Sequence, residues 1–200
     1  NTDNLPVIGI SHIAINPNNS QIMYVVTGDA NGSDTYSIGI LKSIDGGNSW
    51  DTTGLSYNIL QQYRINKIII NPRYTDSLFV ATNNNIMVSS DAGASWSVVG
   101  ITGRWRDIEF KPFSPEIIYA AKQSNGGSNI YRSVDGGVTW QLSNSGMATS
   151  GKDRPLLAVT ISNPNVVYAL FSATDDSYHG IYKSIDSGTT WNLQSNSPNI

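Results

Sequence analysis

The sequence predicts an all-β chain made of four repeated, four-stranded antiparallel sheets. First, an octet with the pattern S-x-D-x-G-x-[ST]-W occurs four times, and its Asp residues are 46, 44 and 51 residues apart. Second, each repeat contains short β-branched and aromatic runs separated by Asn, Gly, Pro and Ser, which is typical of strands and turns. Third, no window of 11 or more residues shows helical periodicity. A four-stranded repeat of roughly 40–45 residues has the size of one β-propeller blade.

The four strands of each repeat follow one order. A first apolar run closes near a Pro, which cannot donate to a strand ladder. A second run carries an aromatic residue, a third leads into the octet, and a fourth begins at the octet Trp. The first runs occupy residues 13–17, 68–72, 108–112 and 157–161. We therefore expect a single β-propeller unit over residues 1–200, with blades at about 10–54, 65–100, 105–144 and 155–194.

The residue types of the octet suit a pinned hairpin between the third and fourth strands. Asp can accept hydrogen bonds from backbone N–H groups a few residues on, and the Gly two positions later permits a positive φ. The Trp offers a large apolar area that can wedge between neighbouring sheets. We expect a structural role for all eight of these side chains: Asp45, Asp91, Asp135, Asp186, Trp50, Trp96, Trp140 and Trp191.

The composition limits the classes of partner. Charged residues make up 14% of the chain and the net charge is −3, with Lys and Arg scattered, which argues against a nucleic-acid surface. No apolar run approaches the ~20 residues of a membrane helix, so membrane insertion is not expected. The chain lacks Cys and is rich in Asn, Ser, Thr, Gly and Tyr, which favours a secreted or cell-surface bacterial protein. The first residue is Asn, which indicates a processed or excised segment.

The octet resembles the Asp-box of the bacterial-neuraminidase-type repeat, and the resemblance covers about residues 10–194. Similar repeats occur in sialidases, xyloglucanase-type glycoside hydrolases, sortilin-like receptors and photosystem assembly factors. The resemblance implies that the octet Asp is structural and lies away from any active site. It also implies six or more blades, so we expect four blades of a larger propeller whose edge blades are covered by remaining blades or a partner chain. This repeat indicates a fold and not a function.

One catalytic candidate follows from the resemblance. Xyloglucanase-type hydrolases carry a catalytic Asp after the second strand of the first blade, where this chain has Asp29. The Arg-Thr-Asp-x-Gly-Gly context of that family is replaced here by residues 26–31, Val-Thr-Gly-Asp-Ala-Asn. The second carboxylate that glycoside hydrolysis requires has no matching residue. The alternative is a solvated loop Asp.

Ligand-binding candidates lie on the loops that leave the sheets opposite the octets, where function is commonly grafted. Arg64 and Arg104 each stand four residues before the apolar part of a first strand, and residues 63–66 echo the sialidase Phe-Arg-Ile-Pro signature without its Pro. Arginine can bind a carboxylate with two parallel bonds, although a structural salt bridge is the alternative. Trp105 lies outside the octets and offers an aromatic face, or packs within its strand. The remaining candidates are Tyr63, Asp176 and Tyr178.

Metal and cofactor signals are weak. Oxygen-bearing side chains alternate along the loop from Asp29 to Asp34, which could hold Ca²⁺; no other cofactor or metal site is expected. Three functions stay open: a scaffold for glycan or protein recognition, a xyloglucanase- or sialidase-like glycoside hydrolase, and a non-catalytic assembly or receptor propeller.

Overall fold

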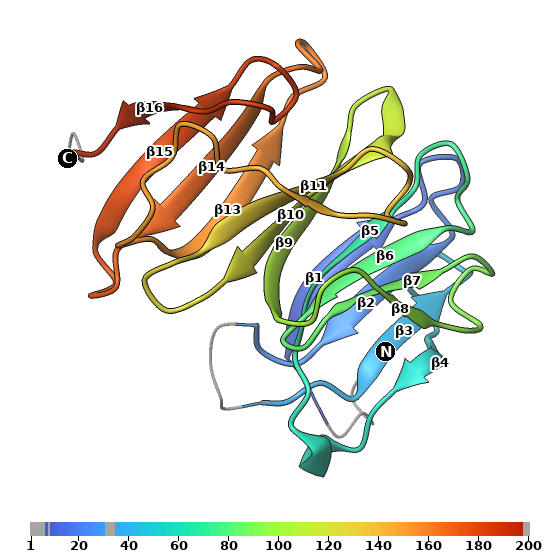
Figure 1. Ribbon diagram of the computed structural model, residues 1–200. Coiled ribbons are helices and arrows are strands. Elements are labelled where there is room, and N and C mark those ends of the chain that lie inside the picture. The colour runs from blue at the N-terminus through green and yellow to red at the C-terminus, as the bar shows by residue number, and fades with distance from the viewer. Residues whose placement is uncertain (1–6, 8, 31–34, 198–200) are drawn as a thin grey trace. The chain divides into compact units, whose positions relative to one another are not determined.

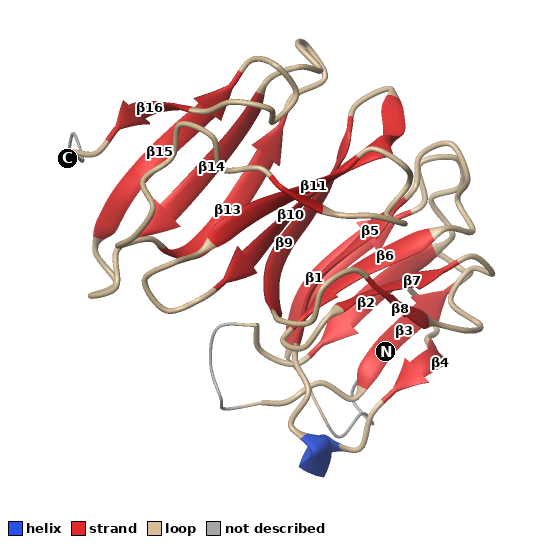
Figure 2. Cartoon of the chain, viewed as in Figure 1, coloured by secondary structure: helices blue, strands red, loops and turns tan. Residues whose placement is uncertain are grey.

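The computed structural model describes residue 7 and residues 9–30 and 35–197. The described chain forms four sheets, each of four strands that pair antiparallel with their neighbours in chain order. Figure 1 shows the strands of each sheet side by side, and Figure 2 shows strands throughout with one short helical turn. That turn is a 3₁₀ turn, η1 (Ile59–Gln61). The predicted all-β fold of four-stranded blades is confirmed.

The four sheets share one strand order, although their strands differ in length. The first sheet contains β1 (Ile10–Ile15), β2 (Met23–Thr27), β3 (Gly39–Ser43) and β4 (Asp51–Ser56). The second contains β5 (Ile65–Ile70), β6 (Leu78–Thr82), β7 (Ile86–Ser89) and β8 (Ser97–Val99). The third contains β9 (Arg104–Lys111), β10 (Ser114–Gln123), β11 (Asn129–Ser133) and β12 (Gln141–Leu142). The fourth contains β13 (Asp153–Val159), β14 (Val167–Ser172), β15 (Tyr178–Ser184) and β16 (Asn192–Ser195). Each last strand begins one residue after its octet Trp.

The chain divides into two compact units, which we describe separately. The first unit covers residues 1–99 and contains the first two sheets, and the second covers residues 100–200 and contains the other two. Each unit is therefore a pair of consecutive sheets with a core between them.

The octets form the same hydrogen-bonded turn four times. In the first, the Ser43 hydroxyl donates to Asp45 Oδ1 at 2.7 Å and accepts from the Gly47 N–H at 2.8 Å. The Asp45 carboxylate also accepts from the N–H and the hydroxyl of Ser49, at 2.9 and 2.6 Å. The equivalent bonds of the other octets measure 2.5–2.9 Å. Both oxygens of each octet carboxylate are thus occupied within the turn.

The turn uses two positions of positive φ. The fifth octet position is the predicted Gly, but the fourth also has positive φ, and Ala92 and Ser187 occupy it at 56° and 58°. The N–H of this fourth residue donates to a carbonyl near the start of the second strand of the same sheet, as from Gly46 to Gln21 at 3.0 Å. The other three sheets repeat this bond at 2.8–2.9 Å. This bond offsets part of the cost of a left-handed conformation at a non-glycine residue.

The octet of one sheet docks on the preceding sheet in each unit. In the first unit the Tyr24 hydroxyl donates to the Ala92 carbonyl at 3.1 Å, and the Gly54 N–H donates to the Gly93 carbonyl at 2.8 Å. A Cβ at Gly54 would overlap the Ala94 carbonyl oxygen, so this close approach requires glycine. Around these bonds lies the core of the first unit: Tyr24, Val26, Ile40, Leu55, Ile65, Ile68, Leu78 and Val80.

The second unit repeats this docking with a larger aromatic contribution. The backbone N–H of Trp191 donates to the Ser145 carbonyl at 2.8 Å, and the Ser143 hydroxyl donates to the Gly188 carbonyl. Trp191 is 2% exposed, and its indole N–H donates to Ser143 Oγ. The other three octet Trp residues are half-buried, and each indole N–H donates to the carbonyl of the Gly at the fifth position of the same octet. The core of this unit is Tyr119, Ala121, Ile130, Met147, Leu157, Val167, Ala169, Phe171, Tyr182 and Trp191.

A break in pairing register recurs where each first strand begins. It lies between Ile10 and His12 in β1, between Ile65 and Lys67 in β5, and at equivalent places in β9 and β13. Such bulges add a residue and redirect side chains at the end of a sheet. The bulges lie at the ends opposite the octets, which is where the predicted ligand-binding loops also lie.

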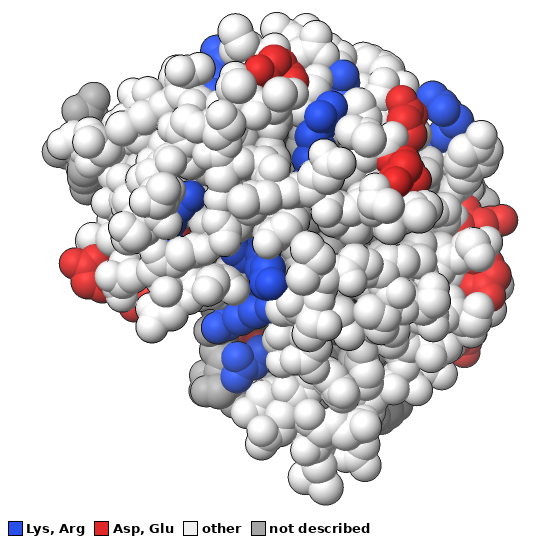
Figure 3. All heavy atoms as spheres, viewed as in Figure 1, with Lys and Arg blue, Asp and Glu red and all other residues white. Residues whose placement is uncertain are grey.

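The surface carries few charges. Most of the face in Figure 3 is uncharged, in keeping with 14% charged residues, and several Lys and Arg groups gather near its centre. Among the described residues, no helix has the length and apolar character needed to cross a membrane.

We predict that removing one octet hydroxyl destabilises its unit. Ser133 is 1% exposed and its hydroxyl accepts the Gly137 N–H at 2.8 Å, so Ser133→Ala leaves a buried donor without its partner. We expect a loss of about 1–3 kcal/mol in the free energy of unfolding, measured by urea denaturation. Exposed Ser97 is the matched control, and Ser97→Ala should leave the transition unchanged. Equal midpoints for the two variants would contradict the proposed role of the octet.

Candidate functional site

The connections opposite the octets bring the candidate residues to one end of each unit. In an antiparallel sheet built in chain order, the loops after the second and fourth strands leave the same end. In the first unit these loops carry Asp29, Tyr63 and Arg64. In the second unit Arg104, Trp105, Asp176 and Tyr178 lie on or beside the corresponding connections.

The first unit gathers three tyrosines and one arginine, which we call the tyrosine–arginine cluster: Tyr36, Tyr57, Tyr63 and Arg64. The rings of Tyr57 and Tyr63 stack with centroids 4.4 Å apart and an angle of 26° between their planes. The Arg64 guanidinium lies over the Tyr36 ring, 5.3 Å from its centroid. All four side chains are half-buried, so each keeps some surface in contact with solvent. The cluster therefore presents aromatic faces beside a cation.

The backbone holds this cluster in a defined conformation. The segment between Tyr57 and Tyr63 contains the η1 turn, in which the Asn58 side chain accepts the Leu60 N–H and the Gln61 side chain accepts the Asn58 N–H. The Tyr63 carbonyl accepts the Ser37 N–H at 2.9 Å, which ties this segment to the loop that carries Tyr36. Pre-ordered side chains bind a ligand with a smaller entropy cost.

Two further groups of the cluster have defined environments. The Tyr57 hydroxyl lies 3.7 Å from Met87 Sδ, and burial, with the neighbouring Tyr63, raises the pKa of Tyr57 to about 12. The contact of Tyr57 with Met87 thus fixes the position of the stacked pair. The Arg64 Nε atom is buried and makes no hydrogen bond within the described part of the chain. The planar Arg64 guanidinium carries other N–H groups that can donate hydrogen bonds to a ligand oxygen.

Asp29 lies on the loop after β2, and its backbone N–H donates to the Thr35 carbonyl at 2.9 Å. The side chain is half-buried. All other described Asp residues of the first unit lie at the octet end: Asp45, Asp51, Asp76 and Asp91. Within the described residues of this unit, Asp29 has no second carboxylate at its end of the sheets. Asn31, Ser33 and Asp34 of the predicted Ca²⁺ loop lie outside the described residues.

Trp105 corrects one expectation. Its side chain is 0% exposed, so it offers no stacking face to a ligand. The indole N–H donates to the Ile101 carbonyl at 3.0 Å, and the ring meets Tyr131 edge-on at 5.3 Å and Trp140 at 6.2 Å. Trp105 packs within its strand because β9 places it on a buried face, and the sequence pattern alone left this alternative open.

Arg104 belongs to a group of charged side chains in the second unit. The charges of Arg104 and Arg154 add to burial in lowering the pKa of Arg106. The carboxylate of Asp107 is 3% exposed and accepts the N–H groups of Leu157 and Ile108 at 2.7 and 2.8 Å. Asp107 therefore links β9 to β13, which makes it structural. The sequence analysis did not single out Arg106 or Asp107, because their positions depend on the bulge in β9 and no sequence motif marks them.

Asp176 and Tyr178 form part of a self-contained loop. Asp176 pairs with Arg154 at 3.3 Å, and both side chains are exposed, so the pair contributes little to stability. The Tyr178 hydroxyl donates to the Ser195 carbonyl at 2.9 Å, which ties the loop to the last strand. The structure thus gives both predicted residues partners within the second unit.

Lys152 is a buried amine that the sequence analysis did not single out. Its side chain is 0% exposed, and its Nζ lies 5.0 Å from the centroid of the Phe171 ring and 4.0 Å from Met147 Sδ. Burial lowers the pKa of Lys152 to about 8. The nearby His179 also has a lowered pKa, caused by burial and by the Lys152 charge. No sequence signal marks this lysine, because the loop that buries it has no motif.

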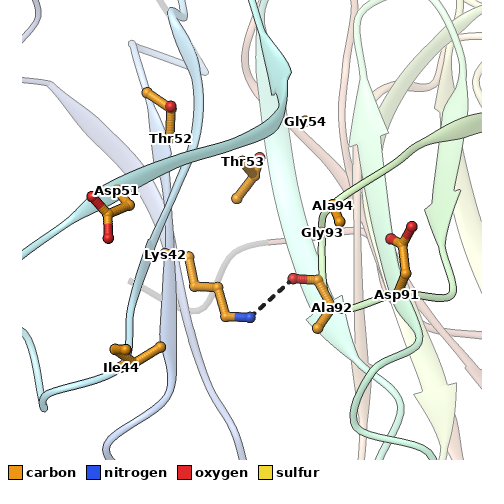
Figure 4. Close-up of a pocket in the computed structure, with 10 residues that line it drawn as sticks. All are labelled: Lys42, Ile44, Asp51, Thr52, Thr53, Gly54, Asp91, Ala92, Gly93 and Ala94. Carbon is orange, nitrogen blue, oxygen red and sulfur yellow. Dashed lines mark hydrogen bonds between the residues drawn. The ribbon is translucent and has the colours of Figure 1, made fainter.

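A groove of about 440 Å³ opens at the octet end of the first unit, between β4 and the second octet. Figure 4 shows Lys42 extending from β3 toward the Ala92 carbonyl, which its Nζ reaches at 3.3 Å, with Asp51 on the opposite wall. The second unit has a groove of about 110 Å³ at the equivalent place, where Arg132 and Leu142 stand in place of Lys42 and Thr52. The larger groove follows from the smaller side chains of β4. Its walls mix polar and apolar residues and contain no aromatic side chain.

No group of three or more His, Cys, Asp or Glu side chains suited to a metal ion occurs among the described residues.

We compared the chain with protein families, curated proteins and solved structures. No family model matches the chain. The chain is 26% identical over 214 residues to the xyloglucanase Xgh74A of Acetivibrio thermocellus, and the match covers 89% of this chain and 24% of that protein. A xyloglucanase of a Paenibacillus species is also 26% identical, over 66% of this chain and 16% of that protein. The chain thus spans a quarter or less of the length of the curated relatives that it matches.

Solved structures agree on the fold. The crystal structure of an ancestral GH74 enzyme matches 97% of this chain and 25% of its own, with a TM-score of 0.78 and 23% identity. The structure of YCF48 bound to D1 peptide matches 94% of this chain and 82% of its own, with a TM-score of 0.51 and 15% identity. These likenesses show a β-propeller fold, and the second shows that a protein with this fold binds a peptide.

We predict that Lys152→Met stabilises the chain at pH 7. The amine has a lower pKa folded than unfolded, so its burial penalises folding while it is charged. The penalty is full below pH 8 and shrinks as pH rises from about 8 toward 10.5. We expect a gain of roughly 2–3 kcal/mol at pH 7 that falls above pH 8, measured by urea denaturation across this range. The control is Lys183→Met, at a lysine that is only half-buried. A gain independent of pH would show that Lys152 is not a penalised buried charge.

Proposed function

We propose that this chain is the glycan-recognition part of a secreted or cell-surface β-propeller protein. The observation that carries the proposal is the tyrosine–arginine cluster, in which pre-ordered aromatic faces stand beside a guanidinium on the loop end of the first unit. The resemblance of the octets to the Asp-box supports a structural role for the opposite end.

The chemistry of the cluster suits a sugar ring. The apolar C–H face of a pyranose can pack on an aromatic ring, and tyrosine combines an apolar body with a polar tip. The Arg64 guanidinium supplies N–H donors for sugar hydroxyl oxygens. The cluster contains no carboxylate, so it binds without providing an acid or base.

The curated relatives support a β-glucan as the ligand class. They are xyloglucanases, and they match up to 89% of this chain. Xyloglucan oligosaccharides are therefore the first probe for binding.

We predict that Tyr63→Ala weakens binding of xyloglucan oligosaccharides by about tenfold, because it removes half of the stacked pair. Isothermal titration calorimetry measures the dissociation constant. Tyr74 is 65% exposed on the turn between β5 and β6, at the octet end, and Tyr74→Ala is the matched control. Equal affinities of the two variants, or no binding by the unaltered chain, would refute the proposed site.

The second candidate is a glycoside hydrolase in which Asp29 supplies one carboxylate. The sequence similarity to xyloglucanases favours it. Hydrolysis requires a second carboxylate about 5–10 Å away, and the described residues of the first unit offer none at that end. The second carboxylate would have to come from outside them.

This second candidate makes a separate prediction. Asp29→Asn should lower the kcat for xyloglucan hydrolysis by about 10²–10⁴ while KM stays unchanged, because Asn cannot transfer the proton. Release of reducing sugar measures the rate, and Asp51→Asn, an exposed substitution at the octet end, is the control. Unchanged hydrolysis in Asp29→Asn would exclude a catalytic role for this residue.

A further inference from the structure

The backbone of Arg64 is held at both of its polar groups by one residue, Asn83. Asn83 follows β6 and lies opposite Arg64, one step beyond the strand pair of Ile65 and Thr82. The Arg64 N–H donates to Asn83 Oδ1 at 3.0 Å, and the Asn83 N–H donates to the Arg64 carbonyl at 3.0 Å. Hydrogen bonds are directional, so this pair of bonds fixes both the position and the orientation of the Arg64 backbone.

The turn that carries Asn83 is ordered by Thr82, the last residue of β6. Thr82 is 2% exposed, and its hydroxyl accepts the N–H groups of Asn84 and Asn85 at 3.1 and 3.0 Å. The same hydroxyl donates to the Asn85 carbonyl at 2.8 Å, and the Thr82 N–H donates to that carbonyl at 2.9 Å. The turn is therefore an ordered support for Asn83.

The carbonyls on either side of Arg64 are bonded to other segments. The Tyr63 carbonyl accepts the Ser37 N–H at 2.9 Å, and the Ile65 carbonyl accepts the Ser11 hydroxyl at 2.9 Å. Three consecutive carbonyls are thus bonded to three different segments of the first unit. The side-chain bond at the Arg64 N–H completes this support.

The position of the Arg64 backbone carries through to its guanidinium. The side chain is half-buried and its Nε atom is buried, so packing around the stem limits the conformations that the side chain can adopt. The guanidinium lies over the Tyr36 ring, 5.3 Å from the centroid. A shift of the Arg64 backbone would therefore move the guanidinium relative to this ring.

The equivalent positions of two other sheets are built differently. In the first sheet they are Gly9 and Gly28, whose backbones bond at 2.7 Å but which have no side chains. In the third sheet Arg104 pairs with Gln123, whose side-chain amide donates to Asp153 at 2.9 Å. The Gln123 Oε1 atom accepts no hydrogen bond within the described part of the chain. Of these three sheets, only the second adds a side-chain bond, and it carries the arginine of the tyrosine–arginine cluster.

We propose that Asn83 is a positioning residue of the glycan site, which holds Arg64 over Tyr36 so that the guanidinium is ordered before a ligand arrives. Its Oδ1 atom is engaged by the Arg64 N–H, so Asn83 acts through Arg64 and not by contact with the sugar. A guanidinium that is already ordered binds with a smaller entropy cost. The inference rests on the proposed function for the ligand, and on the contacts within the first unit for the geometry.

Nuclear magnetic resonance of the free chain tests the positioning without a ligand. The Tyr36 ring shifts the Arg64 Nε–H signal, which is assigned by its loss in Arg64→Lys. In Asn83→Ala we expect this signal to move toward that of an unstructured arginine. The Arg64 backbone N–H should also exchange with solvent at least about tenfold faster, because it has lost its acceptor. Asn83→Asp keeps an acceptor oxygen and should restore both values.

The matched control is Asn84→Ala, which removes the same side chain from the next residue of the turn, where it is exposed. Both Arg64 values should stay as in the unaltered chain. The Trp96 indole N–H, which is bonded within the octet at the other end of the same sheet, reports whether each variant keeps its fold. An Arg64 signal that Asn83→Ala leaves in place, or that Asn83→Asp fails to restore, would overturn the proposal.

Calorimetry with xyloglucan oligosaccharides then measures the effect on binding. Asn83→Ala should weaken affinity by about tenfold, while Asn83→Asp and Asn84→Ala should stay within about twofold of the unaltered chain. Affinity that falls equally in Asn84→Ala, or that does not change in Asn83→Ala, contradicts a positioning role in binding. Absence of binding by the unaltered chain would refute the proposed function, and the free-chain signals would still decide whether Asn83 holds Arg64.

Discussion

The docking of an octet carbonyl onto the preceding sheet is the interaction on which the architecture depends. Neither sheet of a unit could bury its apolar face alone, and each core forms between consecutive sheets. The distance between those sheets is set by backbone contacts, such as the bond from Gly54 to Gly93, and not by side-chain packing alone. The octet must therefore hold its carbonyls in a fixed position, which explains why each turn uses so many internal hydrogen bonds.

This requirement accounts for the chemical inertness of the octet Asp residues. Hydrogen bonds from Ser95 and Ser89 lower the pKa of Asp91 to about 2, so its carboxylate stays ionised and fully engaged as an acceptor. A general acid must hold a proton near the working pH, which this environment prevents. The octet end is accordingly suited to holding the sheets together, and the proposed binding site lies at the other end, where the loops differ in length and residues between repeats.

The candidate residues at that other end separate into two groups once the backbone is known. Tyr63 and Arg64 join Tyr36 and Tyr57 because a hydrogen bond from Ser37 to Tyr63 brings two loops together. Tyr178 and Asp176 are held by partners within their own loop and sheet. The first group is half-buried and keeps some aromatic surface in contact with solvent, and the polar groups of the second have intramolecular partners.

The sequence by itself determined the repeat, the four strands of each sheet, the octet turns and the end of the sheet where loops vary. These features depend on interactions between residues close in sequence, so a pattern of residue types is enough to predict them. Tertiary structure decided the burial of Trp105, the bulge that places Arg106, the enclosure of Lys152 and the clustering of the tyrosines. Each depends on a contact between segments far apart in sequence, and residue type does not specify which segments meet. The octet predicts where sheets join, and only the packed sheets show which side chains remain for a ligand.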